Sequence, residues 1–238
     1  VRCAKRSKPT RARPTRSRQP RGHCDVTTVI VDYNSGNLHS AEKSFQRMAQ
    51  EVSAGKVVVS SDPDAVAAAD RIVLPGVGAF ADCRAGLASY PGLFDAMQEA
   101  VIIRAVPFLG ICVGMQMMAS RGLEHGLNTP GFDWIKGEVV ALTPSDPTLK
   151  IPHMGWNDLV IDTPHPVLDG IKTGDNVYFV HSYHLAANDP SQRLAHCDYG
   201  GEVTAMVGCD NFIGTQFHPE KSQSTGLRLI GNFLLWKP

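Results

Sequence analysis

The chain has 238 residues, 43% of them hydrophobic, which is enough for one large α/β domain or two small ones with a sizeable core. No apolar run approaches the ~18 residues of a membrane-spanning helix, so no membrane association is expected. The six cysteines form no CxxC pair and no regular spacing. We expect reduced thiols in a cytoplasmic protein, without a disulfide framework, a bound metal or a cofactor.

The formal net charge of zero hides two different regions. Residues 1–24 contain nine Lys and Arg and no acidic residue, whereas residues 25–238 contain 14 basic and 23 acidic residues, a net charge of −9. The acidic body argues against nucleic-acid binding. The head is rich in proline and poor in large apolar residues, so we predict a disordered basic extension over 1–24 and one domain over 25–238.

Three interpretations of the basic head stay open. It could be a targeting or binding arm, a transit-like peptide, or an upstream extension translated from a misplaced start codon. We favour the start-site artefact or a functionless tail, because the chain lacks an initial Met and the composition changes abruptly at Asp25.

Short β-branched runs alternate with helical segments over residues 26–120, which predicts parallel pairing in a doubly wound sheet. From about Lys136 the expected strands are shorter and separated by tight turns. The predicted fold class is α/β, with an open, mostly parallel central sheet, flanking helices and an additional antiparallel layer. The expected strands are 26–32, 57–60, 71–74, 105–109, 138–142, 158–160, 176–180, 194–198, 203–209 and 212–216, and the expected helices are 38–49, 63–69, 94–104, 113–120 and 224–235.

The stretch Gly110-Ile111-Cys112-Val113-Gly114 is the cysteine version of the nucleophile elbow G-x-S-x-G. A nucleophile on so tight a strand-to-helix turn needs neighbours without side chains, hence the two glycines. The turn places the sulfur at a helix N-terminus, where backbone N–H groups and the helix dipole favour a thiolate. The pentapeptide alone is equally compatible with a small buried cysteine in a β-α turn.

A thiol nucleophile needs a base, and the base needs an acceptor that orients it. Gln216-Phe217-His218-Pro219-Glu220 supplies both, after an expected hairpin. In an extended segment, residues i and i+2 point the same way, so we expect His218 and Glu220 to share a face. His218 alone could be a structural histidine, but together with the elbow it predicts a triad of Cys112, His218 and Glu220.

Open α/β sheets bind ligands beyond the carboxyl ends of their strands. The loop Pro75-Gly76-Val77-Gly78 is such a strand end, and its glycines let the backbone approach a substrate and let a peptide reorient. Acyl transfer needs donors aimed at an oxyanion. The Val113 N–H is one candidate and an N–H of this loop is the second, although the loop could also be an ordinary β-α turn.

With these motifs in chain order, the sequence resembles the class I glutamine amidotransferases from about Thr28 to Trp236. Within that family it resembles most the glutaminase subunits of imidazole glycerol phosphate synthases, from histidine biosynthesis. Met115, where related synthetase amidotransferases usually carry His, points to the same subgroup. The subgroup motifs are Asp32-Tyr33 with Gly36-Asn37-Leu38, Leu74 to Phe80, Pro152-His153-Met154-Gly155-Trp156-Asn157, and Tyr178-Phe179-Val180-His181-Ser182-Tyr183.

The resemblance implies that glutamine and water give glutamate and ammonia. Cys112 would form a γ-glutamyl thioester, His218 would move the proton, and Glu220 would hold the imidazole. The Val77 and Val113 N–H groups would form the oxyanion hole, with the Val77 N–H turning inward on activation. The implied substrate contacts are Gly76, Gly78, Gln116, Glu124, Ser182 and Tyr183.

The resemblance also implies a heterodimer with a (β/α)8-barrel cyclase subunit, which would use the ammonia to make imidazole glycerol phosphate and aminoimidazole carboxamide ribonucleotide. Such glutaminases are nearly silent until the partner site fills. An exposed Met154 and Trp156 would suit an interface, although both could instead be core residues. The implied partner-facing residues are Asn37, Met154, Trp156, Tyr178 and Lys221.

Three alternatives are weighed against this interpretation. Another class I amidotransferase, of the pyridoxal phosphate or anthranilate type, fits Met115 and residues 152–157 less well. A silent glutamine-sensing or scaffold protein would be favoured by loss of a triad residue, but all three are present. A basic-tailed nucleic-acid binder is opposed by the acidic body. The histidines His181, His184 and His196 are scattered, which argues against a metal site.

Overall fold

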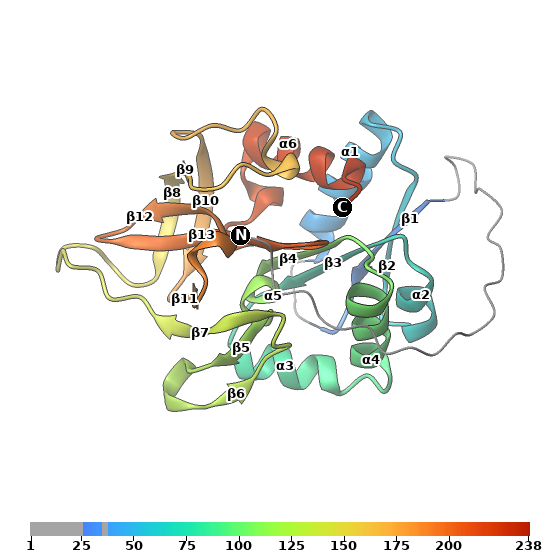
Figure 1. The fold of residues 1–238 in the computed structure, drawn as a ribbon, viewed down its shortest axis with the longest axis horizontal. Helices are drawn as coiled ribbons and strands as arrows, with labels where there is room; N and C mark the ends of the chain where they lie inside the picture. Colours follow the sequence, from blue (N-terminus) through green and yellow to red (C-terminus); the bar gives the residue numbers. More distant parts are fainter. Residues whose placement is uncertain (1–25, 35–37) are drawn as a thin grey trace.

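The computed structural model describes residues 26–34 and 38–238, so the predicted disordered extension 1–24 and the predicted partner residue Asn37 lie outside the described residues. The central sheet contains β1 (Thr27–Val31), β2 (Lys56–Ser60), β3 (Arg71–Gly76), β4 (Phe108–Cys112), β9 (Val160–Ile161), β12 (Arg193–Asp198), β13 (Glu202–Cys209) and β14 (Phe212–Thr215). In this part of the chain the strand order is β2-β1-β3-β4-β14-β13-β12-β9 (Figure 1). The strands from β2 to β14 are parallel, and β13, β12 and β9 continue the sheet antiparallel.

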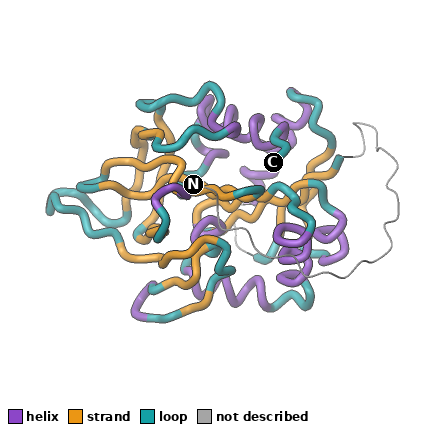
Figure 2. Tube along the Cα trace, in the orientation of Figure 1, coloured by secondary structure: helices purple, strands orange, loops and turns teal. Residues whose placement is uncertain are grey.

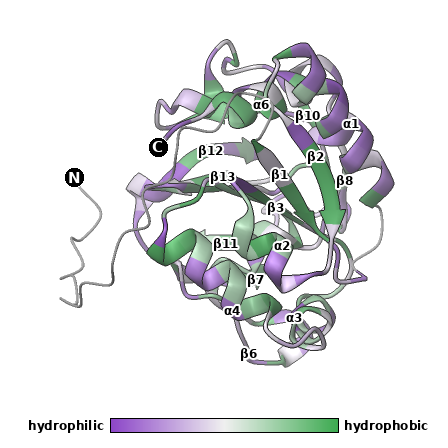
Figure 3. Ribbon diagram, turned by 90° about the vertical axis from the view of Figure 1, so that its right-hand side faces the viewer, coloured by the Kyte–Doolittle hydropathy of each residue, from purple (hydrophilic) through white to green (hydrophobic). Residues whose placement is uncertain are grey.

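Helices cover both faces of this sheet, with α1 and α6 on one face and α2, α3 and α4 on the other (Figures 1 and 2). Phe45 of α1 packs edge to face on Phe233 of α6, with ring centroids 6.4 Å apart. Hydrophobic residues concentrate along the inner strands, while the outer side of α1 is hydrophilic (Figure 3). The helices are α1 (Leu38–Glu51), α2 (Pro63–Ala68), α3 (Phe80–Ala88), α4 (Leu93–Gln98), α5 (Val113–Gln116) and α6 (Gln223–Leu235).

Two smaller sheets lie beside the central one. In the first, β8 (His153–Asp158) pairs antiparallel with β10 (Asn176–His181). The second contains β5 (Ala119–Gly122), β6 (Thr129–Pro130), β7 (Ile135–Ala141) and β11 (Tyr183–Ala187), in the order β11-β7-β5-β6. The predicted fold class is confirmed, but β12 and β13 extend the central sheet rather than forming a separate layer. The reason is that β13 is buried on both faces along most of its length.

The elements around the cysteine motif differ in extent from the expectation. The strand expected over 105–109 is β4, which begins later and includes Cys112 itself. Ala105 has a positive φ of 55°, a left-handed conformation outside the β region, so the strand does not begin at this residue. The helix expected over 113–120 is only the single turn α5, after which the chain enters β5.

Further elements were not expected from the sequence, among them α3, β6, most of β8 and β11. Helix α3 buries Phe80, Cys83 and Leu87, whose helical spacing was present in the sequence, and β11 follows directly after Ser182. The helix expected over 94–104 is α4 followed by a π-helical turn, Glu99–Ile103. None of the helices within the described ranges has the length and apolarity needed to cross a membrane.

Candidate active site

Cys112 ends β4 and precedes α5 with φ 54° and ψ −111°, a region that non-glycine residues rarely adopt. A Cβ on Gly110 would lie 2.5 Å from the Gly114 carbonyl oxygen, and one on Gly114 would lie 1.8 Å from the Leu74 carbonyl oxygen. The two glycines therefore allow close backbone packing of the elbow against β3. The strained conformation itself falls on the cysteine, as a nucleophile elbow requires.

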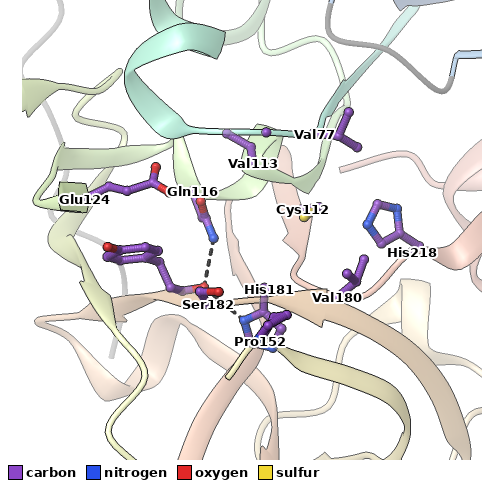
Figure 4. A pocket seen from close by; sticks show the side chains of 12 residues that line it. Val77, Cys112, Val113, Gln116, Glu124, Pro152, Val180, His181, Ser182 and His218 are labelled. Atoms are coloured by element: carbon purple, nitrogen blue, oxygen red, sulfur yellow. Dashed lines mark hydrogen bonds between the residues drawn. The ribbon is translucent and has the colours of Figure 1, made fainter. Parts of the chain in front are cut away.

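A cavity of about 270 Å³ opens beside the cysteine at the carboxyl ends of β3 and β4, a size that suits a ligand as small as an amino acid (Figure 4). It brings together nine of the residues predicted from the sequence. The lining residues are Val77, Gly78, Cys112, Val113, Gln116, Glu124, Pro152, Val180, His181, Ser182, Tyr183 and His218. Gly76 is not among them, because it packs beneath the loop, where a Cβ would meet the Tyr33 hydroxyl at 2.7 Å.

His218 and Glu220 are joined by a contact of 2.8 Å between Nδ1 and Oε1, with side chains only 2% and 3% exposed. The expectation that an extended segment brings them together is wrong. Pro219–Lys221 is a 3-10 turn that begins after His218 and carries the carboxylate back onto the ring. The contact predicted from the sequence is therefore present, but a turn produces it.

The charge state of His218 follows from its neighbours. Burial alone lowers the pKa of this imidazole, but Cys112 and Glu220 together raise it to about 9. Nε2 of His218 is buried and has no hydrogen-bond partner within the described residues, and the ring lies beside Cys112 (Figure 4). The imidazole is thus held protonated at neutral pH, with one N–H committed to Glu220 and the other available on the cysteine side.

The turn that carries His218 is anchored to β10 and α6. The His218 N–H donates to the Tyr178 carbonyl at 3.0 Å. The Ser222 hydroxyl donates to the His218 carbonyl at 2.7 Å and accepts from the Tyr178 N–H at 3.0 Å. A Cβ on Gly226 of α6 would lie only 1.9 Å from the Pro219 carbonyl oxygen, so the helix packs directly on the turn.

The loop after β3 is held by two side chains. The Tyr33 hydroxyl donates to the Pro75 carbonyl at 2.8 Å, and the Cys83 thiol donates to the Val77 carbonyl at 3.3 Å. Burial above all raises the pKa of the Cys83 thiol to about 11, so the thiol keeps the proton that it donates. The peptide that carries the Val77 N–H lies between these two carbonyls, and Gly78 follows with a φ of 99°.

A chain of amides reaches the sulfur. Gln116 is 3% exposed and donates through Nε2 to the Tyr183 carbonyl at 2.9 Å and to Gln216 Oε1 at 3.0 Å. Gln216 Nε2 in turn donates to Cys112 Sγ at 3.6 Å. Gln216 is not among the site residues predicted from the sequence, although it stands two residues before His218 in the same motif.

Two of the other predicted substrate residues, Glu124 and Tyr183, accept hydrogen bonds from backbone N–H groups. The Glu124 carboxylate accepts a hydrogen bond from the Phe80 N–H at the start of α3. The Tyr183 hydroxyl accepts from the His125 N–H at 3.2 Å. His181 and Pro152 also line the cavity and were not selected from the sequence. Within the described ranges, no group of three or more His, Cys, Asp or Glu side chains could hold a metal ion.

Three of the predicted partner-facing residues lie on the strand pair β8–β10, and Lys221 lies beside it in the 3-10 turn Pro219–Lys221. Met154 is 62% exposed and Trp156 is 47% exposed, so the alternative that both are core residues is wrong. Trp156 lies opposite Tyr178 across the pair, with ring centroids 5.9 Å apart. Lys221 Nζ lies 5.8 Å from the centroid of the Tyr178 ring.

A cysteine on a nucleophile elbow beside a buried His–Glu pair is the arrangement that acyl transfer by a thiol requires. The family model "Glutamine amidotransferase class-I" matches residues 29–236, so the chain belongs to this family. It is 69% identical over 213 residues to a protein of Cereibacter sphaeroides named imidazole glycerol phosphate synthase subunit HisH, covering 90% of this chain and 100% of the relative. A relative from Ruegeria pomeroyi with the same name is 64% identical, with the same coverage. A solved structure titled as a glutamine amidotransferase, 17% identical, shares the fold with a TM-score of 0.64 over 87% of this chain and 97% of its own.

These comparisons confirm the resemblance predicted from the motifs. The class I assignment rests on the family model, and the likeness to subunits of imidazole glycerol phosphate synthase rests on the high identity over the full length of both relatives.

Proposed function

We propose that the chain hydrolyses glutamine and passes the ammonia to a cyclase subunit of imidazole glycerol phosphate synthase in histidine biosynthesis. One observation carries the proposal: a buried imidazole, bound to Glu220 and raised to a pKa of about 9, stands beside a cysteine on a nucleophile elbow. The name of the matching family and the size of the cavity support glutamine as the substrate, and the names of the high-identity relatives support imidazole glycerol phosphate synthase. The cytoplasmic location stays a prediction.

The proposed reaction starts from a Cys112 thiolate and a protonated His218. The sulfur attacks the side-chain amide carbon of glutamine, and His218 gives its proton to the departing nitrogen, which leaves as ammonia. The neutral imidazole then takes a proton from water, which attacks the thioester carbon. The carbon–sulfur bond breaks, glutamate leaves, and the thiolate–imidazolium pair is restored.

The oxyanion formed in each step needs backbone donors. We assign the Val113 N–H as the first, because it follows the nucleophile at the start of α5. The Val77 N–H is the second, once its peptide turns inward. The carbonyls on either side of that peptide are already bound to Tyr33 and Cys83, so a turn of this one peptide can keep both bonds.

Glutamine binding is assigned to the rest of the cavity. The Glu124 carboxylate suits the α-ammonium group of glutamine, and Gly78 exposes backbone close to the substrate. Ser182 and Tyr183 line the wall next to Gln116, whose amide is already committed to the Tyr183 carbonyl and to Gln216. We therefore give Gln116 a role in shaping the pocket as well as in contacting substrate.

The proposed partner is a (β/α)8-barrel cyclase subunit that docks on the exposed side of β8–β10. Met154 and Trp156 offer apolar contact there, and Tyr178 and Lys221 extend it, with Asn37 assigned to the same interface. A closed path for ammonia is chemically sensible, because free ammonia is mostly protonated at neutral pH and then is no nucleophile. The cyclase products would be imidazole glycerol phosphate and aminoimidazole carboxamide ribonucleotide.

The test measures glutamate release by the purified chain, alone and with a cyclase subunit plus its nucleotide substrate. We expect strong release only in the assembled, ligand-filled state, lost in Cys112→Ala and retained in Cys209→Ala, whose cysteine lies in the β13–β14 hairpin. High glutamate release by the isolated chain would contradict the proposed dependence of glutamine hydrolysis on the cyclase subunit. No release in any state, despite demonstrated complex formation, would overturn the glutaminase assignment.

A further inference from the structure

Strand β8 has two faces with different surroundings. Its outward residues Met154 and Trp156 are exposed, whereas His153, one residue earlier, is 3% exposed and points inward. The His153 ring is stacked between Phe179 and Tyr199, with centroids 4.7 Å and 3.9 Å away. A single strand therefore carries the proposed docking residues on one side and a buried histidine on the other.

A continuous line of hydrogen bonds runs from this histidine to the glutamine cavity. His153 Nδ1 lies 3.0 Å from His181 Nε2, and His181 Nδ1 lies 2.9 Å from the Tyr183 carbonyl oxygen. The same carbonyl accepts from Gln116. On the other side, Asn157 Nδ2 lies 3.4 Å from His153 Nε2.

The partners fix the direction of every bond in this line. A carbonyl oxygen only accepts, so His181 carries its proton on Nδ1. Burial holds the pKa of His181 at about 3 and that of His153 at about 4, so both rings are neutral at neutral pH. His181 Nε2 is then an acceptor, His153 must donate to it from Nδ1, and His153 Nε2 accepts from the Asn157 amide.

We propose that His153 and His181 are positioning residues which connect the docking strand β8 to the glutamine-binding segment Ser182–Tyr183 through one directed hydrogen-bond chain. The inference rests on the proposed function, because it concerns glutamine binding at that site. His181 holds the Tyr183 carbonyl, the same carbonyl holds Gln116, and Gln116 holds Gln216, which donates to Cys112. Movement of β8 on docking thus reaches the wall of the cavity without crossing solvent.

Two substitutions separate the hydrogen bond from the ring packing. His153→Asn keeps a donor near the Nδ1 position but loses the stacked ring, whereas His153→Phe keeps an aromatic ring between Phe179 and Tyr199 but loses the donor. In the assembled complex we expect His153→Phe to raise the glutamine KM about tenfold with a smaller change in kcat, because one buried hydrogen bond is lost. His153→Asn should stay near the wild-type KM. The opposite order, or equal KM values in both variants, would overturn the proposal.

A second measurement needs neither activity nor a variant. In the full chain labelled with ¹⁵N-histidine, NMR spectra of the imidazoles should show His153 and His181 both neutral and protonated on Nδ1 at neutral pH. A proton on Nε2 of either ring would overturn the directed chain.

Glutamine affinity measured on Cys112→Ala, with and without His153→Phe, keeps the proposal testable apart from hydrolysis. A chain that shows the expected tautomers but never releases glutamate would refute the proposed function and leave the hydrogen-bond chain standing.

Discussion

Cys112 adopts a positive φ although it carries a side chain, and such a conformation costs about 1–3 kcal/mol. The strained conformation persists because the packing of the backbone on either side of Cys112 prevents it from relaxing. Gly110 packs on Gly114, and Gly114 packs on Leu74 of the neighbouring strand. The same contacts that strain the cysteine lift its sulfur to the end of the strand, next to His218.

The protonation of His218 leads to a pH prediction. Its pKa is raised to about 9, so the imidazolium that protonates the departing nitrogen in the proposed mechanism is present below that pH and is lost above it. We expect the kcat/KM of the complex to fall on the alkaline side with a midpoint near pH 9. Glu220→Gln removes one of the groups that raise this pKa, so its alkaline midpoint should move to lower pH. Profiles of kcat/KM against pH, measured for both proteins from pH 6 to 10, give the two midpoints. An unmoved midpoint in the variant would contradict the assignment of the alkaline fall to His218.

Gly78 allows a test of the proposed role of the Pro75–Gly78 loop as an oxyanion donor. Its φ of 99° is strained for any side chain, by about 1–2 kcal/mol, while nothing lies within 4 Å of a Cβ placed there. We expect Gly78→Val to lower kcat far more than it raises the glutamine KM, because a branched side chain directly after Val77 restricts the loop in which the Gly76–Val77 peptide must reorient to offer the Val77 N–H. Gly174→Val is the matched control, with a φ of 95° and equally open space in a distant turn. A fall in kcat matched by an equal rise in the glutamine KM would count against a reorienting loop.

At the level of elements, the position of the turn that carries His218 depends on how α6 packs. Gly226→Ala would place a Cβ 1.9 Å from the Pro219 carbonyl oxygen, whereas Gly231→Ala in the same helix would approach nothing closer than the flexible end of Met48 at 3.1 Å. We expect Gly226→Ala to cost about 1–3 kcal/mol of the free energy of unfolding and to reduce kcat by moving the His218 turn. Gly231→Ala should change the free energy of unfolding by no more than about 1 kcal/mol. Denaturant unfolding of both variants, and kcat measured in the assembled complex, test this expectation. Similar unfolding free energies and kcat values in the two variants would show that α6 does not position the turn.

The elements show what a sequence can and cannot predict. Period and spacing located the strands, the elbow and the His–Glu pair, because those features are local in the chain. The 3-10 turn after His218 was missed, since an i, i+2 contact arises equally in an extended segment. Gln216 and His181 were missed for another reason: their roles come from contacts with Cys112 and His153, which are 104 and 28 residues away in the chain.

Over the whole molecule, the sequence predicted the sheet class but not the way the second half divides between sheets. Alternation of buried and exposed residues along a strand indicates an outer sheet only where one face of the strand meets solvent. β13 is buried on both faces. The β8–β10 pair does present a free face. Its outward side carries the exposed apolar residues, and its inward side carries the buried histidines.

That division leads to a prediction about assembly. Trp156 combines a large exposed ring with the neighbouring Tyr178, an arrangement typical of residues that dominate binding energy in interfaces. We expect Trp156→Ala to weaken cyclase binding by about 2 kcal/mol, roughly thirtyfold in Kd, without lowering the free energy of unfolding. Ile103→Ala is the control, because Ile103 is also exposed and apolar but lies after α4, away from the strand pair. Calorimetric titration with the cyclase subunit distinguishes them, and equal affinities would mean that the partner docks on another face, since an exposed ring buried by docking must contribute to the binding energy.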